Sequence, residues 1–282
     1  MFVTKWGTLG TGYGQFYQPY DVAVASDGIV YVADTMNHRM QKFTSEGVFV
    51  SKWGTEGTGD GQFIYPRGVA VASDGSVYVG DEYNHRIQKF TSEGVFVSKW
   101  GTNGTGDGEF QWPWGIAVAS DGSVYVADKN NNRIQKFTSE GVFVSKWGTN
   151  GSGDGEFVDQ WGVAVASDGS VYVADKDNHR IQKFTSEGVF VGKWGTSGEG
   201  DGEFHWPHGV EVASDGSVYV ADVNHHRIQR FTSDGVFVSK WGTQGTGDGE
   251  FGWPHGVAVA PDGSVYVADT ANDRIQKFSV GP

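Results

Sequence analysis

Histidine is the residue type whose placement in this sequence points most directly to chemistry. Four of the eight histidines recur at one place in a repeated motif, where we expect a structural role: His38, His85, His179 and His226. The other four gather near the C-terminal end: His205, His208, His225 and His255. A catalytic zinc normally uses three protein ligands and an open position. Glu211 is a candidate third ligand beside His208 and His255, because alanine stands at this place in every other repeat.

The other charged motifs favour a structural role. An Asp is followed five residues later by an Arg in every repeat: Asp34 and Arg39, Asp81 and Arg86, Asp128 and Arg133, Asp175 and Arg180, Asp222 and Arg227, Asp269 and Arg274. Such a recurring pair predicts a bidentate brace within a turn. The glycine-rich segment 104–110 lacks the strand–helix context of a dinucleotide site, the lysine of a P-loop and the acid spacing of a calcium loop. No Ser-His-Asp arrangement can be assembled with useful specificity. The sequence thus predicts no catalytic residue, no metal ligand and no cofactor, and a chain that is not an enzyme.

Tryptophan recurs at a fixed spacing and marks the repeat: Trp6, Trp53, Trp100, Trp147, Trp194 and Trp241. Six units account for all 282 residues: 1–47, 48–94, 95–141, 142–188, 189–235 and 236–282. A period in the forties with several short strands per unit is typical of a β-propeller, in which each unit buries its faces only against its neighbours. We therefore expect one domain over residues 1–282. The close likeness of the units also favours a recently amplified or designed array.

Composition excludes several classes of protein. The formal net charge of −13 argues against nucleic acid as a partner, since such proteins usually present a basic face. The chain has no cysteine, which excludes disulfides and thiolate metal sites. No apolar stretch approaches the length of a membrane helix, and Met1 runs directly into an expected strand without a signal peptide. We expect a monomer that does not bind membranes.

Four antiparallel strands are expected in each unit. In the third unit they are 115–120, 123–128, 133–137 and 142–147, joined by tight-turn sequences such as Ser120-Asp121-Gly122. Residues 1–6 supply a fourth strand with no preceding partner, and residues 256–278 supply three strands with no fourth. The N-terminal strand should therefore complete the last blade and remove the open edge of the ring.

The repeated sequence resembles the NHL repeat family, named for an Asn-His-Leu-type motif. That motif reads Asn37-His38-Arg39, Asn84-His85-Arg86 and Asn178-His179-Arg180 here. The resemblance implies an all-β, six-bladed propeller of four-stranded antiparallel blades around a central channel. Peptidyl-hydroxyglycine amidating lyases are similar to NHL propellers and carry zinc on a histidine in a Pro-His-Gly-like element. Pro207-His208-Gly209 and Pro254-His255-Gly256 match that element, whereas the family uses three such histidines on alternating blades.

The expected meander gives the ring two faces of different character. Face two carries the turns between first and second strands and between third and fourth strands, and these are almost constant. Face one carries the other two connections, where the units diverge. Six face-one residues directly precede the first strands: Tyr20, Arg67, Trp114, Trp161, His208 and His255. Three more lie in the connections between second and third strands: Tyr83, Lys129 and Lys176. We predict that these nine residues bind a ligand, although longer loops also tolerate more change than tight turns.

Two functions follow. The first is a non-enzymatic binding or scaffold propeller that presents this variable, aromatic and histidine-containing face to a protein, peptide or small molecule. The alternative is a metal-dependent enzyme similar to the amidating lyases. Glu211 bears on both, because a carboxylate packed between blades would be costly. We therefore predict that Glu211 faces the open, water-filled channel, together with the alanines at its position: Ala23, Ala70, Ala117, Ala164 and Ala258.

Overall fold

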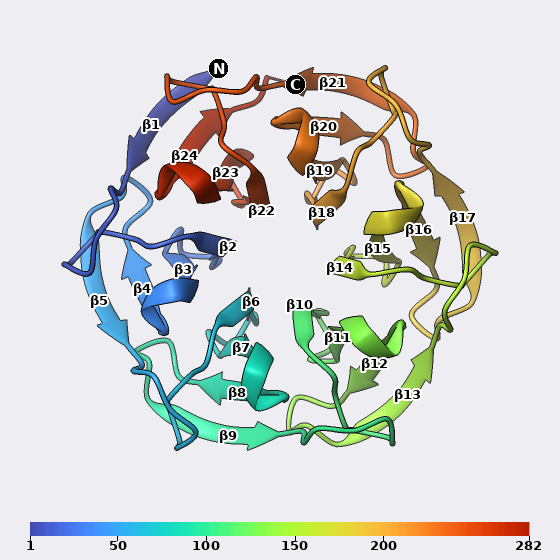
Figure 1. Cartoon of the computed structure of the whole chain (residues 1–282), viewed down its shortest axis with the longest axis horizontal. Coiled ribbons are helices and arrows are strands. Elements are labelled where there is room, and N and C mark those ends of the chain that lie inside the picture. The colour runs from blue at the N-terminus through green and yellow to red at the C-terminus, as the bar shows by residue number, and fades with distance from the viewer. Residues whose placement is uncertain (282) are drawn as a thin grey trace.

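Six four-stranded antiparallel blades form a closed ring around a central channel in the computed structural model, which describes residues 1–281 (Figure 1). The strands of the first three blades, from the channel outward, are β2 (Pro19–Val24), β3 (Val30–Asp34), β4 (Arg39–Phe43) and β5 (Phe49–Trp53); β6 (Pro66–Val71), β7 (Val77–Asp81), β8 (Arg86–Phe90) and β9 (Phe96–Trp100); and β10 (Pro113–Val118), β11 (Val124–Asp128), β12 (Arg133–Phe137) and β13 (Phe143–Trp147). Those of the last three are β14 (Gln160–Val165), β15 (Val171–Asp175), β16 (Arg180–Phe184) and β17 (Phe190–Trp194); β18 (Pro207–Val212), β19 (Val218–Asp222), β20 (Arg227–Phe231) and β21 (Phe237–Trp241); and β22 (Pro254–Val259), β23 (Ser264–Asp269), β24 (Arg274–Ser279) and β1 (Phe2–Trp6).

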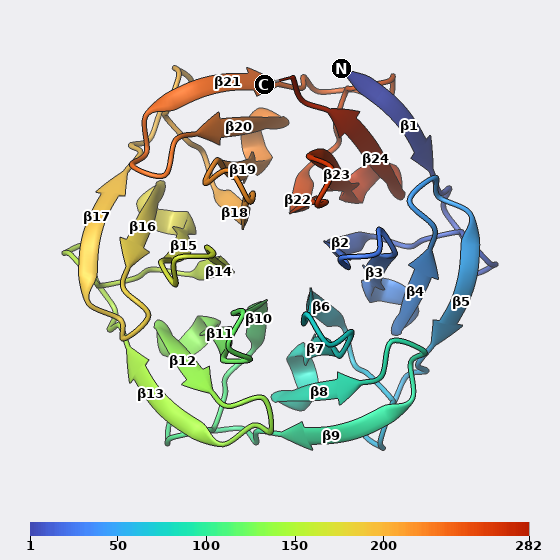
Figure 2. The same cartoon turned by 180° about the vertical axis from the view of Figure 1, so that it is seen from behind.

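The N-terminal strand completes the last blade. β1 pairs antiparallel with β24, with Thr4 opposite Lys277 and Trp6 opposite Ile275. The chain termini therefore lie close together at the rim, as both views of the ring show (Figures 1 and 2). The predicted fold and its closure by residues 1–6 are confirmed.

The apolar core lies between the blades. Tyr78 and Ile87 of the second blade form one buried cluster with Val124 and Phe137 of the third, and equivalent clusters join the other neighbours. Burying such a side chain fully is worth about 1.5–3 kcal/mol. The ring therefore depends on contacts that no single repeat can make alone.

Face one differs in detail from the sequence-based expectation. A short 3₁₀ helix follows the second strand of each blade on this face: η1 (Thr35–Asn37), η2 (Glu82–Asn84), η3 (Lys129–Asn131), η4 (Lys176–Asn178), η5 (Val223–His225) and η6 (Thr270–Asn272). The first strands also begin earlier than expected, because β10 starts at Pro113 and includes Trp114.

No helix within residues 1–281 has the length and apolar character needed to cross a membrane.

The repeated Asp–Arg pair anchors the glycine-rich connection that enters each blade. Arg39 donates from Nε to Asp34 at 2.6 Å, while its other nitrogens donate to the carbonyls of Thr11, Gly12 and Gln15. The same arrangement recurs in the other blades. The structural role is confirmed, but the predicted bidentate pair is wrong, because most of the guanidinium's donors go to backbone carbonyls of the connection.

The repeated histidine links one blade to the next. His38 Nδ1 accepts a hydrogen bond from the backbone N–H of Tyr65 at 3.2 Å, and His226 accepts one from Trp253 at 3.2 Å. Where the motif lacks histidine, the Asn132 and Asp273 side chains accept the equivalent bond. An acceptor at this position suffices, which confirms that these four histidines are structural.

Candidate functional site

The second residue of each innermost strand points to the face-one mouth of the channel, so that one repeat position supplies six side chains of four kinds there. The next residue is glycine in five blades, because neighbouring strands approach closely there. A Cβ added at Gly115 would lie 2.3 Å from the carbonyl oxygen of Trp161, and one at Gly209 would lie 2.4 Å from that of His255. This spacing draws the six side chains together at the axis.

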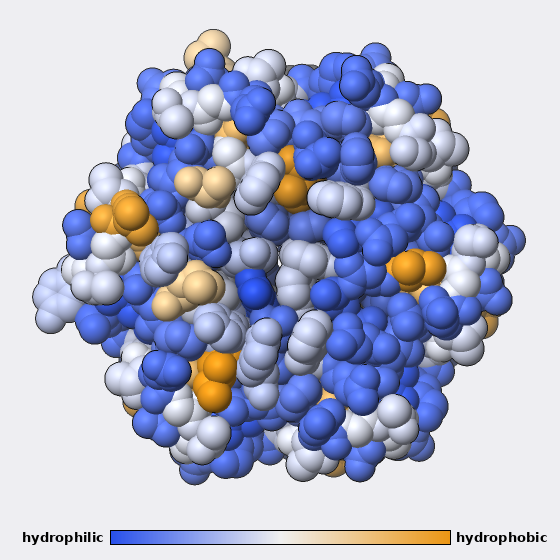
Figure 3. Space-filling view, in the orientation of Figure 1, coloured by the Kyte–Doolittle hydropathy of each residue, from blue (hydrophilic) through white to orange (hydrophobic). Residues whose placement is uncertain are grey.

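Those side chains pack into one group, which we call the mouth cluster: Tyr20, Arg67, Trp114, Trp161, His208 and His255. The ring centroids of Trp114 and Trp161 lie 3.5 Å apart, those of Trp161 and His208 3.6 Å, and those of Tyr20 and His255 4.4 Å. The cluster covers the face-one end of the channel, contrary to the expectation of an open ring around it. In Figure 3, pale residues of intermediate hydropathy surround the centre of this face, and strongly apolar residues are scattered rather than joined in one patch.

Arg67 is held within the cluster. Its guanidinium carbon lies 3.8 Å from the ring centroid of Tyr20 and 4.7 Å from that of Trp114, distances typical of cation–π contacts. Arg67 Nε donates to Glu82 at 2.6 Å, and the indole N–H of Trp114 donates to the same carboxylate. Glu82 therefore fixes two mouth residues from η2.

Lys129 and Lys176 lie beside the cluster and share one acid. Asp159 forms ion pairs of 3.1 Å with Lys129 and 2.5 Å with Lys176. Burial alone would raise the pKa of Asp159, but the two ammonium groups outweigh it and hold that pKa below its usual value. Both lysines also lie near the Trp161 ring, at 5.4 and 5.5 Å. The two predicted ligand-binding lysines are thus tied to the chain's own groups in this structure.

His208 and His255 occupy the most enclosed part of the cluster. They are 4% and 7% exposed, and burial lowers the pKa of His255 to about 3 and that of His208 well below its ordinary value. His255 Nδ1 bonds the Trp253 carbonyl oxygen, whereas neither ring nitrogen of His208 has a partner within residues 1–281. Trp161 Nε1 and Arg67 Nη1 are also buried without a partner in that range. Unpaired buried polar atoms cost about 1–3 kcal/mol each, so the closed cluster is not a fully satisfied packing arrangement.

The other predicted residues are separated from this centre. Tyr83 stacks on Trp112 at 5.6 Å and is 48% exposed on face one. His225 bonds Asp222 at 2.9 Å, and His205 lies beside Asn224, so both belong to the fifth blade's own connections. The structure therefore divides the four extra histidines into a mouth pair and a peripheral pair.

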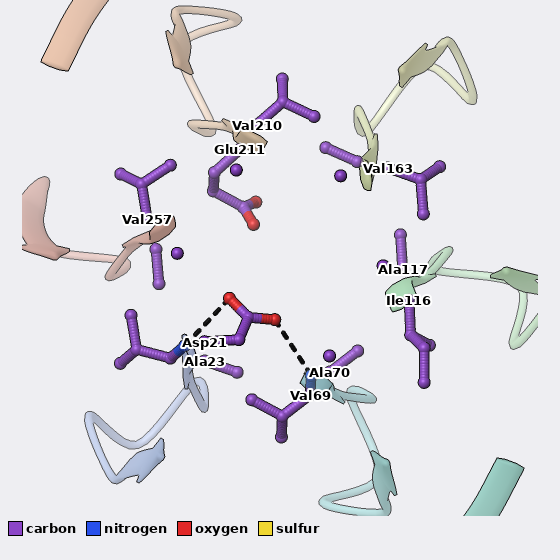
Figure 4. Close-up of a pocket in the computed structure, with 18 of the residues that line it drawn as sticks. Asp21, Ala23, Val69, Ala70, Ile116, Ala117, Val163, Val210, Glu211 and Val257 are labelled. Atoms are coloured by element: carbon purple, nitrogen blue, oxygen red, sulfur yellow. Dashed lines mark hydrogen bonds between the residues drawn. The ribbon is translucent and has the colours of Figure 1, made fainter. Parts of the chain in front are cut away.

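Below the mouth, the channel holds two carboxyl groups. The cavity has a volume of about 170 Å³, and its lining includes Asp21, Glu211 and the five alanines equivalent to Glu211. The prediction that Glu211 faces the channel is confirmed. Both carboxyl groups point toward the channel centre (Figure 4).

Asp21 was not recognised from the sequence, although it replaces the glycine that follows the mouth residue in every other blade. Its carboxylate accepts backbone hydrogen bonds from Val22 at 2.9 Å and from Val69 of the next blade at 3.0 Å. Burial raises the pKa of Asp21 to about 7 despite these bonds. Burial, with a smaller contribution from the Asp21 charge, raises the pKa of Glu211 to about 8. Both residues keep part of their surface open to the channel, but the ring surrounds their carboxyl groups closely, and this burial is the main cause of the large pKa shifts.

The residues of the alternative zinc hypothesis are not brought together as a metal site. Among residues 1–281, no three His, Cys, Asp or Glu side chains lie close enough to hold a metal ion. Glu211 is rooted deeper in the channel than His208, and His208 packs on Trp161. The proposal that Glu211 completes a set of ligands with His208 and His255 is therefore wrong for this geometry.

Distant proteins share this architecture. A streptogramin B lyase structure is 17% identical with a TM-score of 0.69, covering 97% of this chain and 96% of that chain. A gluconolactonase from Xanthomonas campestris is 13% identical with a TM-score of 0.70, covering 94% and 87%. A catalytically inactive virginiamycin B lyase from Staphylococcus aureus, solved with quinupristin, is 17% identical with a TM-score of 0.64, covering 96% and 86%. At these identities the likeness shows the fold alone.

These structures correct the prediction that the chain is not an enzyme. That prediction treated a repeat scaffold without a recognisable catalytic motif as evidence against catalysis. The structures just described, which are similar to this chain in fold, are named as a streptogramin B lyase, a virginiamycin B lyase and a gluconolactonase. The fold therefore gives no ground for the exclusion.

Sequence comparison identifies the repeats themselves. The B-box type zinc finger protein ncl-1 of Caenorhabditis elegans is 51% identical over 43 residues, which is 15% of this chain and 5% of that protein. The chain thus aligns with only a small fraction of this relative's length. The NHL repeat family model matches residues 16–43, 63–90, 110–137, 161–184, 204–231 and 251–278, together more than half of the chain. With one match in each of the six blades, the protein belongs to the NHL repeat family.

Proposed function

We propose that this NHL propeller binds a peptide segment on face one, with the mouth cluster at the centre of the site. The observation that carries the proposal is the cluster itself. One repeat position carries four kinds of side chain in the six blades. These side chains pack together and leave buried polar atoms of Arg67, Trp161 and His208 without partners in the described chain. The repeat's buried Asp, Arg and Gln side chains are hydrogen-bonded almost identically in every blade. The indole N–H of the repeated tryptophan is buried and unpaired in each blade as well, but within residues 1–281 only at the mouth do several unpaired groups from different blades gather in one place.

The unpaired atoms indicate the chemistry of the ligand. Trp161 Nε1 and Arg67 Nη1 are donors, and a neutral imidazole at His208 both donates and accepts. Peptide groups offer matching carbonyl oxygens and N–H groups. A ligand that displaced the packed side chains slightly would satisfy atoms that the unliganded cluster leaves unpaired.

The surroundings of the mouth favour an extended ligand. Tyr83, Trp206 and Trp253 are 48%, 40% and 54% exposed and come from the connections of three different blades. Such rings offer stiff, amphipathic contact area, as peptide- and protein-binding surfaces commonly do. A peptide reaches several of them at once, whereas a compact molecule does not.

A random peptide library displayed on phage tests the proposal. We expect wild-type protein to enrich peptides whose affinity falls at least about tenfold in Trp161→Ala and in His208→Ala, as for central residues of an interface. Tyr13→Ala is the matched control, because Tyr13 is 74% exposed and stacks on Phe49 of the outer strand.

Circular dichroism and thermal melting establish that each variant is folded. Failure to enrich any peptide, or equal binding by the mouth variants and wild type, would contradict the proposal. The divergence of face one would then reflect only the tolerance of longer connections.

A further inference from the structure

The interior of the channel is chemically distinct from the mouth. Below the mouth cluster its walls are formed by the alanines and by valines at the face-two end: Val24, Val71, Val118, Val165 and Val259. Asp21 and Glu211 are the only residues below the mouth cluster that bring carboxyl groups to this lining, and both depart from the repeat's own residue. An apolar tube with two acid groups near one end suits a slender apolar chain that ends in a cation.

The depth of the two acids defines where a cation would lie. Asp21 is the third residue of β2, directly below the mouth, and Glu211 is the fifth residue of β18, one step of the strand pleat deeper. Glu211 has the longer side chain, and both carboxyl groups point to the channel centre (Figure 4). They are close enough for the charge of Asp21 to raise the pKa of Glu211.

A second observation comes from the ceiling of the same cavity. His208 lines it, is 4% exposed, and has no hydrogen-bond partner for either ring nitrogen among residues 1–281. One nitrogen of a neutral imidazole accepts a hydrogen bond. The cavity therefore combines two carboxyl groups with an unused neutral acceptor, which is the complement of an N–H-rich cation.

We infer that the channel binds a primary ammonium group on a slender alkyl chain, which enters through the valine-lined end on face two and is held by Asp21 and Glu211, with the unpaired His208 ring above them. The ligand has the chemistry of an alkylamine or a lysine side chain. This site lies inside the ring, below the peptide surface proposed on face one, and His208 borders both.

The geometry favours ammonium over other cations. A divalent metal needs a compact set of ligands, and no such group of three exists within residues 1–281. A guanidinium is planar and broad, whereas an ammonium is compact and presents three donors. The alanine and valine walls leave an alkyl stem in apolar contact, which stabilises it as burial stabilises any apolar group.

Binding of this kind should release protons. The carboxyl groups of Asp21 and Glu211 keep their protons to about pH 7 and 8, and an ammonium group favours their ionised forms. The other titratable or charged groups facing the cavity are Tyr20, Arg67, His208 and His255 from the mouth. A primary ammonium stays charged to about pH 10, so affinity should rise from pH 6 to pH 9.

Isothermal titration calorimetry with n-hexylammonium chloride tests the inference. We expect measurable binding at pH 9, at least about tenfold weaker binding at pH 6, and at least about tenfold weaker binding in Glu211→Gln and in Asp21→Asn. Glu211→Ala provides a second variant, since it restores the repeat's residue. Glu46→Gln, on an exposed face-two turn, should bind as wild type does.

Two further titrations separate the possible outcomes. 1-Hexanol has the same chain without the charge, and equal binding of the alcohol would reduce the site to an apolar tube. The second titration uses calcium chloride. If wild type binds calcium but not hexylammonium, and the channel variants lose calcium binding, the site is a metal site and the inference is overturned. Unchanged hexylammonium affinity in all three channel variants would also overturn it.

Discussion

Two substitutions at the scale of single residues give the channel its chemistry. Glu211 and Asp21 stand where the other units have alanine and glycine, respectively. Each carboxyl group is enclosed by the ring, so the protonated form is favoured well above the usual pH range of a carboxylic acid. The ionisation of these two groups should therefore make the stability of the protein depend on pH.

Replacing Glu211 by alanine should stabilise the protein at high pH. The pKa of Glu211 is about 8 in the folded protein, compared with the ordinary value of 4.5 that we take for the unfolded chain. Its contribution to stability is therefore fully present below pH 4.5 and is lost as pH rises through 8. We expect Glu211→Ala to raise the unfolding free energy by about 2 kcal/mol near pH 9 and to change it by less than about 0.5 kcal/mol near pH 5.

Urea denaturation of both proteins at the two pH values measures this difference. Glu46→Gln, which changes an exposed carboxylate, is the control and should show no pH-dependent gain. A gain at pH 5 that equals the gain at pH 9 would show that Glu211 is not the titrating group.

At the scale of elements, the constant turns of face two join neighbouring blades. Gly141 lies in the turn between β12 and β13 with φ of +82°, and a Cβ there would lie 2.5 Å from the Trp100 ring of the preceding blade. Gly122, between β10 and β11, has φ of +86°, but a Cβ there would meet the Ser139 side chain only at 3.6 Å. Both glycines adopt the left-handed conformation, while only Gly141 also supports an inter-blade contact.

This pair separates backbone strain from packing. We expect Gly122→Ala to lower the unfolding free energy by about 1 kcal/mol, the cost of a left-handed non-glycine residue. Gly141→Ala should cost about 3 kcal/mol, because the indole of Trp100 must also move. Urea denaturation gives both values, and equal losses would show that the tryptophan accommodates a methyl group freely.

At the scale of the whole molecule, the ring is held shut by one strand from the other end of the chain. β1 pairs with β24, and Phe2 packs on Phe278 with ring centroids 6.1 Å apart. Without β1, the last blade would end in an unpaired strand edge, which favours self-association. Closure therefore protects both stability and solubility.

Deletion of residues 1–6 should lower the unfolding free energy by about 3 kcal/mol or more and promote oligomers, since strand pairing and buried aromatic contacts are lost together. Thermal melting and size-exclusion chromatography measure the two effects. Val3→Thr is the control, because Val3 is 50% exposed on the outer strand and threonine also favours strands. A deletion variant that melts and elutes like the full chain would mean that β1 contributes nothing to closure.

The sequence by itself determined the architecture. Its period, its alternating strands and the unmatched strands at the two ends allow only a ring in which residues 1–6 complete the last blade, because each repeat must bury its faces on a neighbour. It also placed Glu211 in the channel, since an unpaired carboxylate between packed blades would be too costly. Local pattern and burial suffice for inferences of this kind.

Only the tertiary structure decided what the divergent residues do. Sequence spacing placed Tyr20, Trp161 and His208 at the channel mouth. It did not predict that these side chains pack on one another and close the mouth. Asp21 was missed, although it is the one departure from glycine at its repeat position. In the first blade Asp21 is paired opposite Ala33, whereas in the other five blades the equivalent glycine is unpaired. Whether side chains from different blades meet depends on the radius and stagger of the closed ring, which no single repeat encodes.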